Sequence, residues 1–269
     1  MIIIGEKING SIPSVGQAIA ERDEEIIRQR VRSQALAGAD FIDCAAGTEA
    51  SLEYDAMCWL IDLIQSETEK PICIDSPNAA LLARLISEEK LSRAGMVNSV
   101  SLEGKKCETV FPLIAGTDWS VIALTCDDNG IPAAPEKRVE IAKRLIDKAD
   151  NAGIALNKLH IDPCVMSMAV APSSMSDFVC CVKAIHEFAP EVKVTGAISN
   201  ISYGMPARKY VNMSFMTSVV EAGLDSAIMD PTSHQMMGIM YAAAALKGDD
   251  PGGRKYNRAY RKGLFGEKK

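Results

Sequence analysis

The sequence predicts an α/β fold, a (β/α)8 or TIM barrel, and three observations carry this prediction. A short apolar run, a loop and an amphipathic helix pattern recur eight times within residues 1–246 of the 269-residue chain. The runs are apolar throughout, as in parallel strands that helices cover. No G-x-G-x-x-G motif follows the first run, which disfavours the alternative of a doubly wound open sheet.

The first four units begin with short apolar runs. Ile2–Ile4 is the first run, and the helix pattern after it ends before Gly38, a typical C-cap. The next run, Phe41–Ala45, already contains one polar residue, Asp43. The four predicted strands cover residues 2–4, 41–45, 71–75 and 95–98, and their helices cover residues 24–37, 53–65, 78–88 and 107–115.

The last four units repeat this order. Their predicted strands cover residues 120–124, 159–162, 192–197 and 226–229, and their helices cover residues 136–151, 176–188, 209–222 and 234–246. The helix over 136–151 has the clearest pattern, with apolar residues at three- and four-residue spacing and charges between them. Residues 1–246 are therefore expected to form a single barrel domain.

Composition and charge limit the class of protein. Hydrophobic residues make up 48% of the chain and charged residues 24%, which argues against disorder. The net charge of −6 and the pI of about 5.3 disfavour nucleic-acid binding. The apolar runs are shorter than the ~18–20 residues of a membrane span. No basic segment precedes the apolar N-terminus, as it would in a signal peptide, so we expect a cytoplasmic protein.

Basic residues gather at the C-terminus. Residues 247–269 contain eight Lys and Arg against three Asp and Glu, a net charge of +5, which leaves −11 on residues 1–246. A solvated, basic C-terminal extension is the simplest interpretation. Docking of an acidic partner is the alternative.

The spacing of the eight cysteines is not typical of a redox or metal site. No C-x-x-C pair occurs, and no Cys and His spacing is typical of a zinc site. Several lie inside apolar strands, where free cysteine behaves as a small buried hydrophobe. We expect reduced core residues and no metal site.

Polar side chains occur at the predicted strand ends, which meet at one mouth of a barrel and carry its function. Asp and Asn also form turns and cap helices. Their recurrence at the ends of four strands, at Asp75, Asn98, Asp162 and Asn200, nevertheless favours a binding site. The full set is Glu6, Asn9, Asp43, Asp75, Asn98, Ser99, Asp128, Asn129, Asp162, Ser199, Asn200 and Asp230.

Carboxylates and amides in this arrangement suit a flat heterocycle with N–C–N edges. An Asp accepts two parallel hydrogen bonds from neighbouring N–H groups, and an Asn offers both donor and acceptor. Lys7 is the only Lys or Arg recognised near these positions, which argues against a phosphate-rich substrate. No His lies beside a Ser or Cys nucleophile, which argues against a catalytic triad. The three histidines, His160, His186 and His234, are interpreted as structural or solvated.

Six short motifs occur in order at these strand ends. They are Gly5–Gly10 (GEKING), Ile74–Ser76 (IDS), Val97–Ser99 (VNS), Ile161–Pro163 (IDP), Ser199–Ser202 (SNIS) and Ala227–Asp230 (AIMD). Together they resemble the methyltetrahydrofolate–corrinoid/iron-sulfur-protein methyltransferases of the pterin-binding TIM-barrel superfamily. The resemblance extends through residues 1–246.

This resemblance implies a barrel that holds the pterin of a folate in its mouth. It implies that Asp75, Asn98 and Asp162 hydrogen-bond the pterin ring. It places Asn200, as the catalytic residue, near N5, and Ile228 in the wall of the same pocket. The remaining substrate-binding positions expected at these strand ends are Glu6, Asn9, Asp43, Ser99, Gly196, Ser199, Ser202 and Tyr203.

The resemblance also implies the activity. Family members move a methyl group between N5 of tetrahydrofolate and the cobalt of a corrinoid bound on a separate protein, and the direction stays open here. The substrate is therefore tetrahydrofolate or 5-methyltetrahydrofolate. The sequence shows no corrinoid-binding module, so a corrinoid protein is the expected partner. Family members are typically homodimers.

One position departs from the family. Tyr203 stands where these enzymes usually place Gln, and a phenol cannot make both hydrogen bonds of an amide. Two alternatives are kept. Dihydropteroate synthase shares the pterin-binding acids but displaces pyrophosphate with a late Lys and a Ser-x-Arg-type motif, neither of which is recognised here. A non-catalytic scaffold for a corrinoid protein is the other, and the complete set of polar strand ends argues against it.

Overall fold

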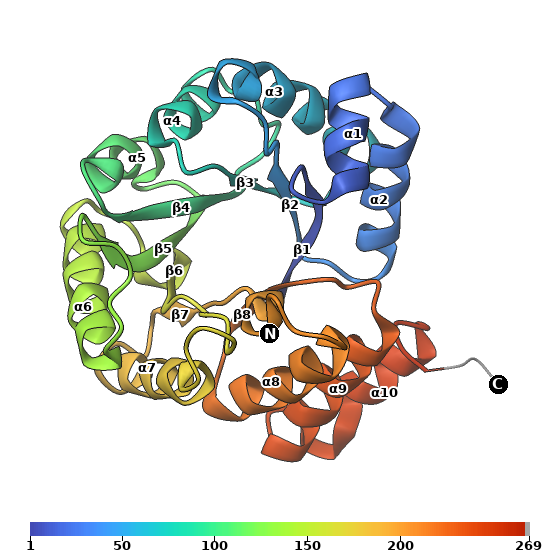
Figure 1. The fold of residues 1–269 in the computed structure, drawn as a ribbon, viewed down its shortest axis with the longest axis vertical. Coiled ribbons are helices and arrows are strands. Elements are labelled where there is room, and N and C mark those ends of the chain that lie inside the picture. Colours follow the sequence, from blue (N-terminus) through green and yellow to red (C-terminus); the bar gives the residue numbers. More distant parts are fainter. Residues whose placement is uncertain (267–269) are drawn as a thin grey trace.

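Eight parallel strands follow one another around a ring, with the helices outside them (Figure 1). The computed structural model describes residues 1–266. The strands pair in the order β7-β6-β5-β4-β3-β2-β1-β8. They are β1 (Ile2–Asn9), β2 (Phe41–Ala45), β3 (Ile72–Asp75), β4 (Met96–Leu102), β5 (Ser120–Asp127), β6 (Leu159–Asp162), β7 (Lys193–Val194) and β8 (Ser226–Met229). The predicted (β/α)8 barrel is confirmed.

The ring closes between β7 and β8. Ala197 and Ile228 form a single parallel bridge, and the Ile228 N–H donates to the Gly196 carbonyl at 3.0 Å. The Asp225 N–H donates to the Val194 carbonyl at 3.0 Å. These contacts join the two edge strands just before the segment that carries Asn200.

The helices of the described chain follow the strands in order. They are α1 (Pro13–Glu21), α2 (Glu24–Leu36), α3 (Ala50–Glu67), α4 (Ala79–Ser87), α5 (Lys106–Ile114), α6 (Pro135–Asn151), α7 (Ser174–Phe188), α8 (Arg208–Ala222), α9 (His234–Lys247) and α10 (Arg254–Arg261). Short 3-10 turns are η1 (Leu156–Lys158), η2 (Ile198–Ser202) and η3 (Pro251–Gly253). Within residues 1–266, no helix is long and apolar enough to cross a membrane.

The barrel interior is filled from several strands. Ile4, Cys73, Met96, Ile122 and Ile228 form a buried cluster inside the ring, while a larger core lies between the strands and the helices. This division follows from the alternation of side chains along each strand.

The side chain of His160 is part of the buried core. It is 1% exposed, and its Nδ1 lies 2.7 Å from the Ser226 hydroxyl, which ties β6 to β8. Burial lowers the pKa of His160 to about 3, so the ring stays neutral. The structural interpretation of this histidine is confirmed.

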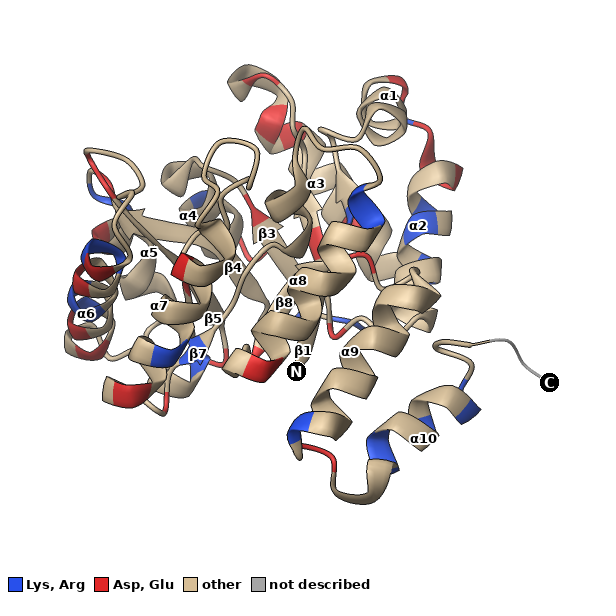
Figure 2. Ribbon diagram, turned by 60° about the horizontal axis from the view of Figure 1, so that its bottom comes forward, with Lys and Arg blue, Asp and Glu red and all other residues tan. Residues whose placement is uncertain are grey.

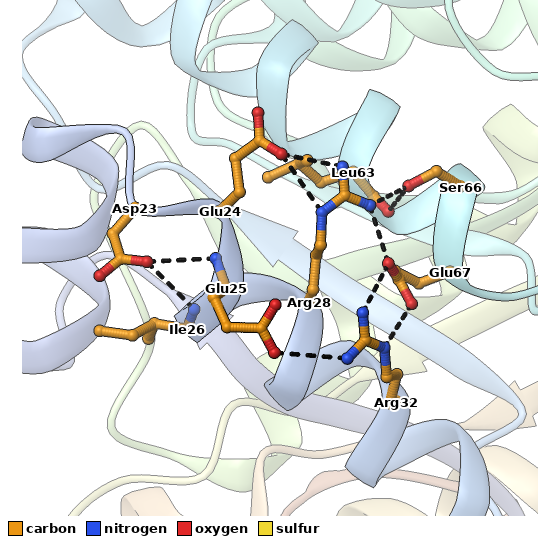
Figure 3. A network of polar contacts seen from close by, with 9 residues as sticks. All are labelled: Asp23, Glu24, Glu25, Ile26, Arg28, Arg32, Leu63, Ser66 and Glu67. Atoms are coloured by element: carbon orange, nitrogen blue, oxygen red, sulfur yellow. Dashed lines mark hydrogen bonds and ion pairs between the residues drawn. The ribbon is translucent and has the colours of Figure 1, made fainter.

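Charged side chains fasten α2 to α3. Arg28 and Arg32 of α2 both bind Glu67 at the end of α3, at 2.8 and 2.6 Å (Figure 3). Hydrogen bonds from Arg32 and Arg28 lower the pKa of Glu67 to about 2. The start of α2 is capped by the Asp23 carboxylate, which accepts from the Glu25 and Ile26 N–H groups. These contacts fix the helices beside β1 and β2.

The C-terminal segment is packed in part. Phe265 is 6% exposed and lies against the rings of Tyr241, Tyr256 and Tyr260, while Ala259 of α10 is also buried. Figure 2 shows α10 and its basic residues beside α9, on the side of the barrel where the N-terminus lies and away from α1. A fully solvated extension is therefore wrong for residues 259 and 265, and residues 267–269 lie outside the described chain.

Candidate active site

One cavity of about 940 Å³ occupies the mouth of the barrel, at the carboxyl ends of the strands. Most of the predicted site residues line it: Glu6, Asn9, Asp43, Asp75, Asn98, Ser99, Asp162, Ser199, Asn200, Tyr203 and Ile228. Asp230 lies there as well, whereas Asp128 and Asn129, from the same set of strand ends, do not. Residues far apart in the sequence thus meet in one space.

Two of the predicted substrate-binding residues do not line the cavity either. Ser202 is fully buried behind it, where its hydroxyl donates to the Ser199 carbonyl at 3.2 Å. Gly196 packs against α7, because a Cβ at this position would lie 2.6 Å from Cζ of Phe178. Both residues support the segment that carries Asn200.

Gly196→Ala is therefore expected to destabilise the barrel. Phe178 is fully buried, so it cannot yield, and overpacking of this kind costs ~1–3 kcal/mol. The midpoint of thermal unfolding should fall by roughly 3–10 °C. Gly238→Ala in α9 is the matched control, since its Cβ would meet Phe265 atoms only at 3.4 Å and beyond. An unchanged midpoint for Gly196→Ala would contradict this packing.

Three carboxyl groups lie in the cavity wall, those of Asp43 and Asp162 buried and that of Asp75 half-buried. Burial raises the pKa of Asp162 to about 7, against the opposing hydrogen bond from the Cys164 N–H at 2.7 Å. Burial, together with the nearby Glu53 carboxylate, raises the pKa of Asp75 to about 7. Burial and the neighbouring Asp75 raise the pKa of Asp43 well above its usual range. These groups stay ionised at neutral pH most readily when a ligand donates hydrogen bonds to them.

Asp43 also orients its neighbour across the barrel. The Asn98 Nδ2 donates to Asp43 Oδ1 at 3.4 Å, and both side chains are nearly buried. With its amide nitrogen turned toward Asp43, Asn98 presents its carbonyl oxygen as a hydrogen-bond acceptor. The site is therefore rich in acceptors.

A second cluster of polar side chains lies near the ends of β1 and β8. The Ser199 hydroxyl donates to Glu6 at 3.2 Å, and Lys7 forms an ion pair with Asp230 at 3.2 Å. Burial and the charge of Asp230 raise the pKa of Glu6, while the Ser199 hydrogen bond and the cations Lys7 and Arg208 oppose this shift. Glu6 thus lies close to the segment that carries Asn200.

Asn200 stands on the short turn η2, at the exposed side of the cavity. Its backbone N–H donates to Ala197 and its carbonyl accepts from Tyr203, which leaves the side-chain amide for a ligand. Arg208 holds this turn from α8, donating to the Ser199 carbonyl at 2.7 Å and to the Ser202 hydroxyl at 3.0 Å. Tyr203 is 72% exposed at the rim.

Sequence reasoning missed the residues that α8 contributes. Arg208, Lys209 and Asn212 line the cavity, so Lys7 is not its only cation and the earlier interpretation is wrong on this point. The Asn212 Oδ1 atom is buried without a hydrogen-bond partner in the described chain. The i, i+4 spacing of Arg208 and Asn212 places them on one face of the helix, a signal that a search of strand ends does not include.

Residues 9–230 match the family described as "Pterin binding enzyme". The chain is 45% identical over 268 residues to the methylcorrinoid:tetrahydrofolate methyltransferase of Eubacterium limosum, covering 99% of this chain and 98% of that one. The chain belongs to this family of pterin-binding methyltransferases.

More distant relatives share parts of this family's structure. The methionine synthase of Mycobacterium tuberculosis is 31% identical over 242 residues, which are 85% of this chain but 20% of that protein. The dihydropteroate synthase of Xanthomonas albilineans, solved with 7,8-dihydropteroate, superposes with a TM-score of 0.67 at 15% identity, over 92% of this chain and 93% of that one. At that identity the likeness shows the fold alone. The methyltransferase interpretation is favoured over the dihydropteroate synthase alternative.

Proposed function

We propose that this methyltransferase moves a methyl group from the cobalt of a methylcorrinoid to N5 of tetrahydrofolate. The observation that carries the proposal is the meeting of Asp75, Asn98, Asp162 and Asn200 in one cavity. The full-length relative from Eubacterium limosum supports both the substrates and this direction. The reverse direction uses the same site and the same residues.

The buried acceptors suit the pterin ring. Its amide and amino N–H groups offer parallel donors, and Asp75 and Asp162 are carboxylates that can accept them in pairs. The carbonyl oxygen of Asn98, turned inward by Asp43, accepts a further N–H. Because the ring is flat and the wall is fixed by strands, these contacts hold N5 in one position.

Asn200 acts at N5. Before transfer, its amide oxygen accepts the N5–H and raises the electron density on the nitrogen that attacks. As the bond between N5 and the methyl carbon forms and the cobalt–carbon bond breaks, the N5 proton passes to solvent at the exposed side of the cavity. The amide nitrogen can then donate to the lone pair of N5. The corrinoid, a substrate here, supplies a methyl group whose bonding electron pair stays on cobalt. Arg208 and Ser202 hold the Asn200 turn in place for this contact.

The partner and the assembly follow from the same proposal. The corrinoid arrives on a separate protein that docks over the mouth of the barrel, beside the exposed Tyr203. We propose a homodimer in the cytoplasm.

Folate affinity is expected to fall as the pH drops below 7. The pKa values of Asp75 and Asp162 are both about 7 in the free protein, and donors of the pterin bind the ionised carboxylates. Affinity should fall about tenfold per pH unit for each carboxyl that must ionise. Calorimetric titration with 5-methyltetrahydrofolate between pH 5.5 and 8.5 measures this dependence of affinity on pH. Constant affinity across that range would contradict the assignment.

The stability of the free protein, unlike its folate affinity, should fall as the pH rises toward 7. Each of these carboxyls has a raised pKa in the folded state, so the folded state binds more protons than the unfolded state between about pH 4 and 7. The contribution of Asp162 to stability therefore falls as the pH rises through that window. Thermal unfolding of the wild type and Asp162→Asn at pH 5 and pH 7.5 tests this, and the variant should lose less stability on going to pH 7.5.

The proposed reaction is tested by the visible spectrum of the corrinoid. The purified protein is mixed anaerobically with methylcob(III)alamin and tetrahydrofolate, and loss of the methyl–cobalt band is expected only with enzyme and folate. A parallel assay supplies 6-hydroxymethyl-dihydropterin diphosphate and p-aminobenzoate. Release of pyrophosphate there, with no change in the corrinoid spectrum, would support the dihydropteroate synthase alternative instead.

A further inference from the structure

Arg138 is a buried arginine outside the cavity. It lies near the start of α6 and is 2% exposed, and Figure 1 shows this helix on the outer side of β5 and β6. Within the described part of the chain, its guanidinium donates only to backbone carbonyls. These are Pro132 at 2.7 Å, Pro163 and Cys164 at 3.3 Å each, and Ala133 at 3.5 Å. Arg138 joins no ion pair among residues 1–266. A buried cation without a paired anion is costly, so this charge needs an explanation.

Cys164 links this arginine to the site. Its carbonyl accepts from Arg138, and its N–H donates to Asp162 Oδ1 at 2.7 Å. Cys164 has a φ of +63°, a left-handed conformation that residues with a side chain rarely adopt. The residue must therefore be held by its surroundings. Arg138 donates hydrogen bonds to the carbonyls of residues 163 and 164, and these bonds can hold Cys164 in that conformation.

We propose that Arg138 is the positioning residue for Asp162: it holds the 163–164 turn so that the Cys164 N–H orients the carboxylate, and its buried charge favours the ionised form that binds the pterin. This inference rests on the proposed function. It assigns to a residue of α6 an effect on folate binding that no cavity contact would reveal.

The other titratable groups near Asp162 and Cys164 are neutral or lie farther along the strands. From the turn after β6 comes the Cys164 thiol, whose pKa burial raises well above its usual range, so it stays neutral. From β5 comes Cys126 beside Cys164, and burial raises the pKa of Cys126 to about 11. From β7, Lys193 pairs in register with His160, nearer the start of β6. Among the described residues, Arg138 is the permanent charge that acts on Asp162, and it lowers the pKa of that carboxyl.

The test compares two substitutions by calorimetric titration with 5-methyltetrahydrofolate between pH 6 and 9. Arg138→Gln removes the positive charge and most of the N–H donors of the guanidinium. We expect about a tenfold loss of folate affinity at pH 7. The pH below which its folate affinity falls should rise by about one pH unit.

Arg138→Lys keeps the charge but cannot reach all four carbonyls. We expect its folate affinity to fall below the same pH as in the wild type and to be about threefold lower. Arg144→Gln, at an exposed position of the same helix, should behave as wild type.

A double-mutant cycle separates this role from general support of the fold. In an Asp162→Asn background, Arg138→Gln should lower folate affinity less than twofold, because the group through which it acts has lost its charge. Equal losses in both backgrounds, or an unchanged pH dependence of folate affinity in Arg138→Gln, would overturn the proposal. If Arg138→Gln does not fold, Arg138→Lys decides, and wild-type affinity in that variant would overturn it. Absence of folate binding in the wild type would instead refute the proposed function.

Discussion

Asn200→Ala is expected to lower the rate of methyl transfer by about 10²-fold while changing folate affinity less than about threefold. The side-chain amide of Asn200 stands at the cavity, with only its backbone groups used within the described chain. A contact that strengthens as charge changes at N5 stabilises the transition state more than the bound substrate. Its loss therefore lowers kcat with little change in affinity.

Single-turnover kinetics with methylcob(III)alamin and tetrahydrofolate measure the rate, and calorimetry measures the affinity. Asn129→Ala is the matched control, since Asn129 also follows a barrel strand but does not line the cavity. A rate within threefold of wild type for Asn200→Ala would remove this residue from the reaction. A tenfold loss of affinity at an unchanged rate would make it a binding residue only.

Asp162→Ala is expected to weaken folate binding by ~1–3 kcal/mol, a loss of roughly 5- to 150-fold. Asp162 is 6% exposed, and one of its oxygens is already engaged by the Cys164 N–H. The carboxylate keeps its other oxygen and the second lone pair of Oδ1 for the paired donors of the pterin. Losing it leaves the donors of the ligand unpaired in a buried wall, where an unpaired group is costly.

The measurement is the dissociation constant at pH 8, where the wild-type carboxylate is ionised. Asp147→Ala, at an exposed position of α6, is the control for loss of a carboxylate and should leave affinity unchanged. The rate at saturating folate should change less than the affinity. Wild-type affinity in Asp162→Ala would contradict pterin binding at this wall.

Much of the fold could be predicted because the strands are buried on both faces. Such strands are continuous apolar runs, so all eight could be located, from Ile2–Ile4 to Ser226–Met229. The nine-residue α1 was missed, since Pro13–Glu21 follows β1 where a loop was expected. Strand β7 is shorter than its apolar run, at Lys193–Val194, because the chain there turns toward η2.

The site could be predicted only where strand ends supply it. The carboxyl groups of Asp43, Asp75 and Asp162 lie in the cavity because parallel strands end at one mouth. Arg208 and Asn212 come from a helix whose cavity face is polar, so no apolar pattern marks it. Gly196 supports packing, which depends on the distance to Phe178 and cannot be read from a motif.

The most direct test of methyl transfer to N5 follows the methyl carbon itself. The protein is incubated anaerobically with ¹³C-methyl-labelled methylcob(III)alamin and tetrahydrofolate, and the products are examined by carbon NMR. The label is expected on N5 of the folate, in amounts that depend on enzyme and are greatly reduced by Asn200→Ala. Label that stays on cobalt in the presence of enzyme and folate, or that appears on any other atom of the folate, would contradict the proposed reaction.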